Sequence, residues 1–366
     1  MPRIVYMPST PLNVFVSTVL AIARKDLDSA ELWLIDQKNI DSNHYFDSIK
    51  KWTDNPFLKI RIFSGQEKGW KKKQERHRNF KLIAQGLHDF QPEIIAVGSD
   101  RRLEFQYAMH IMKSSKKPAQ GWYIDDGLYS YAGRPYHKIN DNVNKLLKKL
   151  CYGFWWDEPK TIGASNWIDQ AWLFKPEFSI APIQKKTCSQ LKPSWLTAPE
   201  IKNLSKSILS TYGIQNSKLA ELEYLDILLL VPHPANLKKI NNYADNIHNF
   251  IKMLHINGIN IGIKYHPRTV EKDPLHFSNY TNTLLVPSEI AFEFILPFLK
   301  ASTHIIGDIS SALLTAQWLR PDVQVTALLD SANTFQNEFH NLYEALGIKY
   351  VEHLQDLTLS NHKAEL

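Results

Sequence analysis

Short apolar runs rich in β-branched residues alternate with longer amphipathic stretches along this chain, and the alternation occurs twice. Runs of this kind predict buried parallel strands, and the amphipathic stretches predict helices that cover both faces of a sheet. The predicted strands are 4–7, 31–35, 58–63, 93–97 and 121–124 in the first series, and 226–231, 259–265, 283–286, 304–306 and 323–328 in the second. The sequence therefore predicts an α/β fold of two Rossmann-like domains that face a cleft.

The length of 366 residues fits two domains of average size. We place the first domain at 1–190, a polar, proline-bearing linker at 191–220 and the second domain at 221–366. The predicted helices are 12–24, 76–88, 104–113, 236–254, 289–299 and 310–319. The segment 130–190 is aromatic and basic, without a clear period, and we assign it no regular structure.

Composition indicates a protein of a reducing compartment. The chain has only two cysteines, Cys151 and Cys188, which is not the framework of a disulfide-stapled secreted protein. No apolar run approaches the roughly 20 residues that span a bilayer. The apolar stretch 14–23 has the length of a signal peptide, but Pro11 and Asn13 interrupt its start and Arg24 follows it, so we expect a strand, turn and helix there. We therefore expect a cytoplasmic protein.

The net charge of +6 is concentrated partly in the run 68–78, with a second cluster at Lys145, Lys148 and Lys149. Such a field attracts polyanions, which include nucleic acid, anionic lipid of the inner membrane leaflet and acidic polysaccharide. A solvated loop and helix face is the alternative interpretation. No nucleic-acid-binding module is present, so we predict no specific nucleic-acid partner.

Three short motifs follow predicted strands. The first ends the strand 121–124 with Asp125, Asp126 and Gly127. Because adjacent side chains of a strand point to opposite faces, one carboxylate can face the cleft while the other caps the turn. The carboxylate in the cleft could take the proton from an attacking hydroxyl. The alternative is a plain Asx-turn before a helix.

The second motif follows the strand 259–265 and contains His266 and Pro267, flanked by Lys264 and Arg268. Proline fixes the extended backbone of the histidine, so the imidazole has a defined direction. Together with Arg268, His266 could bind a phosphate and protonate a leaving group. A structural histidine at a strand end is the alternative.

The third motif follows the strand 304–306 and contains Gly307, Ser310 and Ser311. Ser310 is placed as the N-cap of the next helix, where free backbone N–H groups and two hydroxyls can bind an anion. A simple helix cap is the alternative. Two further candidates are the turn Ser9-Thr10 after the first strand and His233, which stands between two prolines and could be a second phosphate ligand.

Several common motifs are absent. The chain contains no phosphate loop of the Gly-x-x-x-x-Gly-Lys-Ser/Thr type, no Gly-x-Gly-x-x-Gly after the first strand, no His-Glu-x-x-His, no Cys-x-x-Cys and no Gly-x-Ser-x-Gly. ATPase, dehydrogenase, zinc-enzyme and hydrolase functions lose support.

The ordered set of Asp125-Asp126-Gly127, His266-Pro267 and Ser310-Ser311 resembles the three motifs of bacterial sialyltransferases and polysialyltransferases. The resemblance spans most of the chain. It implies a GT-B fold and an inverting reaction that uses CMP-sialic acid and needs no metal. It also implies that Asp125 or Asp126 is the general base, that His266 is a general acid or phosphate stabiliser, and that Ser310 and Ser311 bind the CMP phosphate.

The resemblance leaves several features open. The donor could carry sialic, pseudaminic or legionaminic acid, and the acceptor could be an oligosaccharide or a lipid-linked glycan of a capsule or lipooligosaccharide. A lipid-linked acceptor and the basic clusters together favour peripheral contact with the anionic inner membrane. One alternative is a GT-B transferase that uses UDP-sugars, GDP-sugars or CMP-Kdo. A second is a non-catalytic protein that binds polyanions or glycans through its basic and tryptophan-rich stretches.

Overall fold

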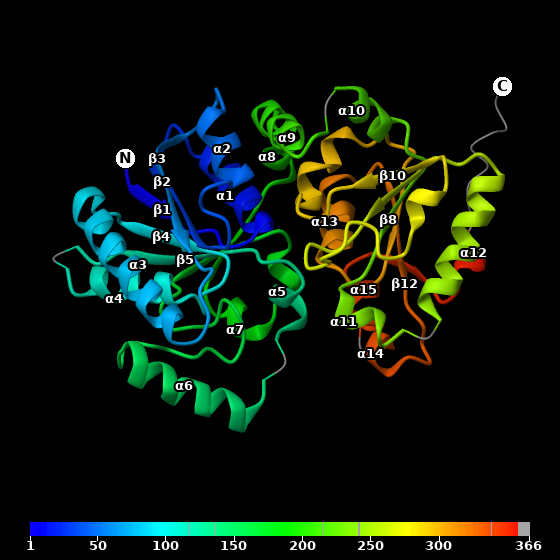
Figure 1. Cartoon of the computed structure of the whole chain (residues 1–366). Coiled ribbons are helices and arrows are strands. Elements are labelled where there is room, and N and C mark those ends of the chain that lie inside the picture. The colour runs from blue at the N-terminus through cyan, green and yellow to red at the C-terminus, as the bar shows by residue number, and fades with distance from the viewer. Residues whose placement is uncertain (116, 135, 215, 241, 338, 358–366) are drawn as a thin grey trace. The chain divides into compact units, whose positions relative to one another are not determined.

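A computed structural model contains two parallel sheets, one in each half of the chain (Figure 1). It describes residues 1–357 except 116, 135, 215, 241 and 338. The chain divides into two units, Met1–Thr211 and Tyr212–Leu366, and each has its own sheet and core. The two predicted Rossmann-like folds are confirmed.

The first unit has a seven-stranded sheet in the order β3-β2-β1-β4-β5-β6-β7, and every strand pair is parallel. The strand order reverses between β1 and β4, and open α/β sheets bind ligands at such a reversal, beyond the carboxyl ends of the strands. The strands are β1 Arg3–Tyr6, β2 Ser29–Gln37, β3 Phe57–Ser64, β4 Ile94–Val97, β5 Gln120–Ile124, β6 Gln170–Leu173 and β7 Thr187–Gln190.

Helices cover both faces of this sheet. Apolar side chains of α3 and α4 join the core on one face, while α1 lies with α8 and α9 on the other. Thr10 caps α1 and Pro11 occupies its first turn, so the helix begins directly after β1. The helices are α1 Pro11–Ala23, α2 His44–Lys51, α3 Gly69–Phe90, α4 Leu103–Lys113, α5 Tyr129–Ala132, α6 Lys138–Tyr152, α7 Ala181–Gln184, α8 Pro193–Leu196 and α9 Pro199–Thr211, with the 3₁₀ turn η1 Pro176–Phe178.

The second unit has a six-stranded parallel sheet in the order β10-β9-β8-β11-β12-β13, which reverses between β8 and β11. Its strands are β8 Ile227–Leu230, β9 Ile261–Lys264, β10 Thr283–Val286, β11 His304–Gly307, β12 Gln324–Leu328 and β13 Lys349–Val351. Its helices are α10 Asn216–Glu223, α11 Pro234–Leu237, α12 Tyr243–Ile256, α13 Ser311–Leu319, α14 Thr334–Asn337 and α15 His340–Ala345, with the 3₁₀ turns η2 Phe277–Asn279 and η5 Leu354–Asp356.

Several sequence-based boundaries differ from the structure. The predicted helix 289–299 is two 3₁₀ turns, η3 Phe292–Phe294 and η4 Leu296–Phe298, because Pro297 has no N–H to give to a helical ladder. The predicted helix 236–254 is split into α11 and α12. The segment 191–220, predicted as a linker, is helical, and its α8 and α9 belong to the first unit. The segment 130–190 contains α6, β6 and β7.

Among the described helices, none has both the length and the apolar character that crossing a membrane requires. The stretch 14–23 lies in α1, and almost all of its side chains are buried in the first unit. This burial agrees with the predicted strand, turn and helix at the start of the chain.

Candidate active site

Two carboxylates stand at the carboxyl end of β5 in the first unit. Asp125 and Asp126 follow the last strand residue, and Gly127 then adopts a positive φ of 85°, which turns the chain towards α5. Asp125 is buried and Asp126 is partly exposed, because neighbouring side chains at a strand end point to opposite faces.

Asp125 is completely buried and accepts four hydrogen bonds. Its Oδ1 accepts from the backbone N–H of Gly127 at 2.8 Å and from the Ser130 hydroxyl at 2.9 Å. Its Oδ2 accepts from the backbone N–H of Phe174 at 3.0 Å and from the Tyr131 hydroxyl. Burial raises the pKa of Asp125, and these donors oppose the rise. Asp125 therefore fixes the turn and ties it to the residue that follows β6.

Asp126 keeps part of its surface exposed. Its Oδ1 accepts from Nδ2 of Asn13 at 2.8 Å, and within the described residues its Oδ2 accepts no hydrogen bond. Burial raises the pKa of Asp126 to about 7, the nearby Asp125 and Asp100 carboxylates add to the rise, and Asn13 and Arg102 oppose it. A partly exposed carboxylate with a pKa near neutrality has the properties of a general base.

The direction of Asp126 depends on the turn after β1. Asn13 is fully buried in the first turn of α1, and the Ser9 hydroxyl donates to its Oδ1 at 3.5 Å. The Thr10 hydroxyl accepts from the Asn13 backbone N–H at 3.2 Å and so caps the helix. A Cβ atom at Gly98, directly after β4, would lie 2.1 Å from Nδ2 of Asn13, so only glycine leaves room for this amide. The structure thus brings the Ser9-Thr10 turn to Asp126 across the point where the strand order reverses.

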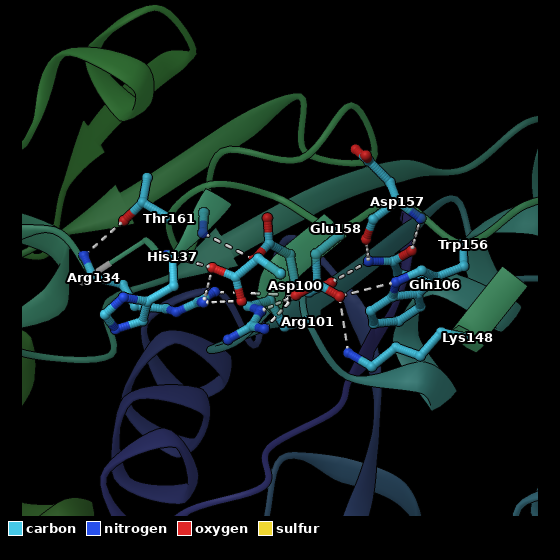
Figure 2. A network of polar contacts seen from close by, with 12 residues as sticks. Asp100, Arg101, Gln106, Arg134, His137, Lys148, Trp156, Asp157, Glu158 and Thr161 are labelled. Carbon is cyan, nitrogen blue, oxygen red and sulfur yellow. Dashed lines mark hydrogen bonds and ion pairs between the residues drawn. The ribbon is translucent and has the colours of Figure 1, made fainter. Parts of the chain in front are cut away.

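A second buried carboxylate orders the loop beside this edge. Asp100 accepts from the backbone N–H groups of Gly163 at 3.0 Å and Ser165 at 2.8 Å. Burial raises its pKa, and the two backbone donors oppose the rise. Figure 2 shows that Asp100 belongs to a wider polar network with Gln106 and Glu158. Asp100 therefore supports the loop that leads into β6, and its negative charge also acts on Asp126.

Two histidines follow neighbouring strands in the second unit. His233 comes after β8 and His266 after β9, and their ring centroids are 4.7 Å apart. Nδ1 of His233 accepts from the backbone N–H of Ala235 at 2.9 Å, and Nδ1 of His266 accepts from that of Arg268 at 3.1 Å. An acceptor Nδ1 carries no proton, so each neutral ring carries its hydrogen on Nε2.

Both imidazoles are held in the neutral form. Burial, together with the nearby His233, Arg268 and Lys264, lowers the pKa of His266 to about 4. Burial and Arg268 also lower the pKa of His233. The pair therefore presents two neutral Nε2–H donors, which suits hydrogen bonding to phosphate oxygens and does not suit a protonated histidine in the free protein. This favours a phosphate ligand among the two roles expected for His266, and the role of general acid stays a prediction.

The serine motif follows β11, the strand beside β8. Ser310 follows β11 and caps α13, since its hydroxyl accepts from the Ala312 backbone N–H at 3.0 Å. Tyr343 holds the turn, because its hydroxyl accepts from the Ser310 backbone N–H at 2.6 Å and donates to the Ser310 carbonyl at 3.2 Å. Ser311 is the first helical residue and is partly exposed. His266, His233 and Ser310 therefore follow three adjacent strands, β9, β8 and β11.

The flanking candidates lie in different surroundings. Lys264 is buried, donates to the Ser288 carbonyl at 3.1 Å, and has a pKa lowered to about 8 by burial against the opposing charge of Glu293. Pro267 and Arg268 are exposed, and Gly307 is the last residue of β11. Lys264 thus supports the sheet edge from inside, whereas Arg268 stands on the surface.

Sequence reasoning located the edge residues but missed the groups that orient them. No recognisable motif contains Asn13, Gly98 or Tyr343. The one available signal was a polar residue directly before the apolar stretch 14–23, and that residue is Asn13. Among the described residues, no group of three or more His, Cys, Asp or Glu side chains is arranged to hold a metal ion.

No protein-family model matches the chain, and no curated protein sequence matches it. Solved structures do match. A Photobacterium damselae sialyltransferase fragment that corresponds to its GT-B domain is 15% identical with a TM-score of 0.55, and the match covers 96% of this chain and 100% of that one. The chain has a GT-B fold.

Other proteins with this fold differ in activity. A 2,6-sialyltransferase of Photobacterium sp. JT-ISH-224, crystallised with CMP and lactose, is 14% identical with a TM-score of 0.57, and the match covers 95% of this chain and 78% of that one. A UDP-GlcNAc 2-epimerase of Methanocaldococcus jannaschii is 12% identical with a TM-score of 0.56, over 96% and 89% of the two chains. At these identities the GT-B likeness establishes the fold, and function must be argued from the site residues.

Proposed function

We propose that this protein is an inverting, metal-independent glycosyltransferase. It would move sialic acid or a related nonulosonic acid, such as pseudaminic or legionaminic acid, from a CMP donor to a bacterial surface glycan. The observation that carries the proposal is the partly exposed Asp126, whose pKa is about 7, which follows β5 beside the reversal point of the first sheet. The paired imidazoles and the capped helix α13 of the second unit would bind the phosphate of the donor.

Asp126 would act as the general base, and Asp125 would hold its turn. The hydroxyl of the acceptor attacks the anomeric carbon of the donor sugar, and its proton passes to the Asp126 carboxylate. The new glycosidic bond forms as the bond from the anomeric carbon to the phosphate oxygen breaks, and CMP leaves with the electron pair. A single displacement of this kind inverts the anomeric centre.

The second unit would stabilise the departing phosphate. His266 and His233 offer Nε2–H donors, and Ser310 and Ser311 stand at the amino end of α13, where the helix dipole favours an anion. Fixed donors that meet developing negative charge can lower a barrier without a bound cation. This supports the proposal that neither a metal nor another cofactor is required.

The partners and location proposed here are those expected from the sequence. The acceptor would be an oligosaccharide or lipid-linked glycan of a capsule or lipooligosaccharide, and the protein would be cytoplasmic with peripheral contact to the inner membrane. The basic residues of α3 and α6 support the membrane contact.

We expect transfer from CMP-sialic acid or another CMP-nonulosonic acid to continue at an unchanged rate when EDTA is added. The reason is that the proposed site contains fixed N–H and O–H donors where a cation would otherwise be needed. The measurement is product formation by chromatography, with the acceptor varied between free oligosaccharide and a lipid-linked glycan. Loss of activity in EDTA that added Mg²⁺ or Mn²⁺ restores would contradict the metal-independent mechanism.

Nucleotide binding separates the alternatives. Thermal stabilisation by CMP and CTP, with none by UDP or GDP, supports the proposed donor class. Stabilisation by UDP or GDP alone would favour a transferase that uses UDP-sugars or GDP-sugars. Turnover of CMP-Kdo in place of a CMP-nonulosonic acid would identify Kdo as the transferred sugar. Tight, salt-dependent binding of arbitrary DNA without any nucleotide effect would favour a non-catalytic polyanion-binding protein.

A further inference from the structure

Helix α6 carries its apolar side chains on the side that faces solvent. The exposed apolar residues of the helix, together with one residue just beyond its end, are between 52% and 80% exposed: Ile139, Val143, Leu146, Leu147, Leu150 and Phe154. At about 100° per residue, the five helical members lie within a stripe roughly 100° wide. We call this stripe, with Phe154, the α6 apolar face.

The opposite side of α6 is polar and holds the helix on the first unit. Asp141 is buried and takes two hydrogen bonds from the Arg134 guanidinium, at 2.5 and 2.6 Å. Lys148 donates to Glu158 at 2.9 Å and lies 4.2 Å from the centroid of the Trp156 ring. Figure 2 shows Arg134 and Lys148 within one polar network around Glu158.

This arrangement is the inverse of an ordinary surface helix, which packs its apolar side on the core and turns its charges to water. Asp141 and Lys148 lie about 150–170° from the centre of the stripe by helical geometry, so their ion pairs fix the apolar face outwards. A contiguous exposed apolar surface of this kind marks an interaction site. Figure 1 shows α6 along the margin of the first unit, away from the strands of its sheet.

Positive charge and an exposed tryptophan adjoin this face. The carboxyl end of α6 meets α3, since the rings of Tyr152 and His77 are 6.2 Å apart. About two turns nearer the start of α3 lies Trp70, which is 75% exposed and has its ring centroid 5.3 Å from the Lys73 ammonium. Lys71 and Lys72 beside it are also exposed. An apolar helix face bordered by lysines and tryptophan is the composition of a helix that lies in a lipid interface.

We propose that the α6 apolar face docks on an anionic lipid surface, with Lys71 and Lys72 of α3 against the lipid phosphates. The apolar side chains enter the boundary between headgroups and acyl chains. A second copy of the chain suits the face less well, because dimerisation through it would bring the same lysines together. This docking rests on the peripheral membrane contact of the proposed function and specifies its surface, and it does not depend on the reaction that the protein catalyses.

The test is flotation of the purified full-length protein with vesicles of phosphatidylcholine containing about 30% phosphatidylglycerol, at low and high salt. We expect the wild type to bind these vesicles, and binding to weaken as salt rises. The Leu146→Gln/Leu150→Gln double variant should lose at least about tenfold in vesicle partitioning, because both side chains leave the proposed contact. Its melting temperature should not change, since both leucines are exposed in the free protein.

The matched control is Leu58→Gln/Ile256→Gln, which removes two other apolar side chains that are 72% and 74% exposed but lie outside the α6 apolar face. It should bind as the wild type does. In a Cys188→Ala background, a polarity-sensitive dye on the exposed Cys151 of α6 should shift its emission to the blue on vesicles. Equal vesicle binding by both double variants, or none by the wild type, would overturn the proposal. A dimer that only Leu146→Gln/Leu150→Gln dissolves, without vesicle binding, would assign the face to a second copy.

Discussion

Asp126→Asn should reduce kcat for sugar transfer by about a thousandfold while leaving the protein folded. The asparagine carbonyl can still accept from Asn13, so the local geometry is kept and only the base is removed. The reaction rate and the thermal melting curve are measured on the same preparation.

Asp126→Asn should not lower the stability of the protein, although it lowers the activity. Burial raises the pKa of Asp126 in the folded protein to about 7, above its ordinary value. The folded state therefore favours the protonated acid, and the stability that this contributes is lost as pH rises towards 7. Asp126→Asn removes the cost of the buried charge, so its melting temperature should equal or exceed that of the wild type at pH 8, with a smaller difference at pH 5.

The control is Asp125→Asn, for which we expect the loss to be in stability instead of in the chemical step. Either orientation of the new amide turns an NH₂ group towards a backbone N–H, that of Gly127 or that of Phe174. We expect a loss of about 2–3 kcal/mol of stability, and a melting temperature lower by several degrees. Full activity in Asp126→Asn would remove the assigned base. Severe unfolding in Asp126→Asn and none in Asp125→Asn would exchange the two roles.

The same base predicts the pH dependence of the reaction. The wild-type kcat/KM should rise with pH to a plateau, with an apparent pKa of about 7, as Asp126 ionises in the free enzyme. His266 has a pKa of about 4 and stays neutral across this range, so no descending limb is expected from it.

His266→Ala should lower kcat/KM by about 10²- to 10³-fold, because one fixed donor to the departing phosphate is lost. His266→Gln should recover part of this loss, since its amide can donate a hydrogen bond but cannot transfer a proton. His233→Ala should have a smaller effect of the same kind, because its ring lies beside that of His266. The measurement is initial rates at saturating and limiting CMP donor.

The matched control for these variants is His353→Ala, an exposed histidine of the same unit. It should be as active as the wild type. Wild-type rates in His266→Ala would remove the histidine from the mechanism. Equal inactivity of His266→Gln and His266→Ala, together with a rate that falls as pH rises above neutrality, would restore the interpretation of His266 as a general acid.

The sheets and the edge residues could be predicted from the sequence because parallel strands buried on both faces produce nearly continuous apolar runs. Strands such as 121–124 and 304–306 are of this kind, and motif residues follow them closely. A polar residue after such a run must lie at the carboxyl edge of the sheet. This is why Asp126, His266 and Ser310 were located without coordinates.

Other features depend on contacts between distant segments. The different roles of Asp125 and Asp126 result from Asn13 and Phe174, which are far away in sequence. The sequence of α6 has the amphipathic pattern of a helix, but this pattern could not show that its apolar side faces solvent. The polar strand β7 has no apolar run at all, and only its position beside β6 makes it a strand.

The proposed mechanism requires one CMP-sugar to reach both Asp126 and the donors of the second unit. The most direct measurement is a crystal structure with bound CMP. We predict the phosphate within hydrogen-bond distance of Nε2 of His266 and of the amino end of α13 at Ser310, with Asp126 facing the position of the departing sugar. CMP bound away from His266, or an Asp126 that faces a different region from the phosphate, would contradict the account.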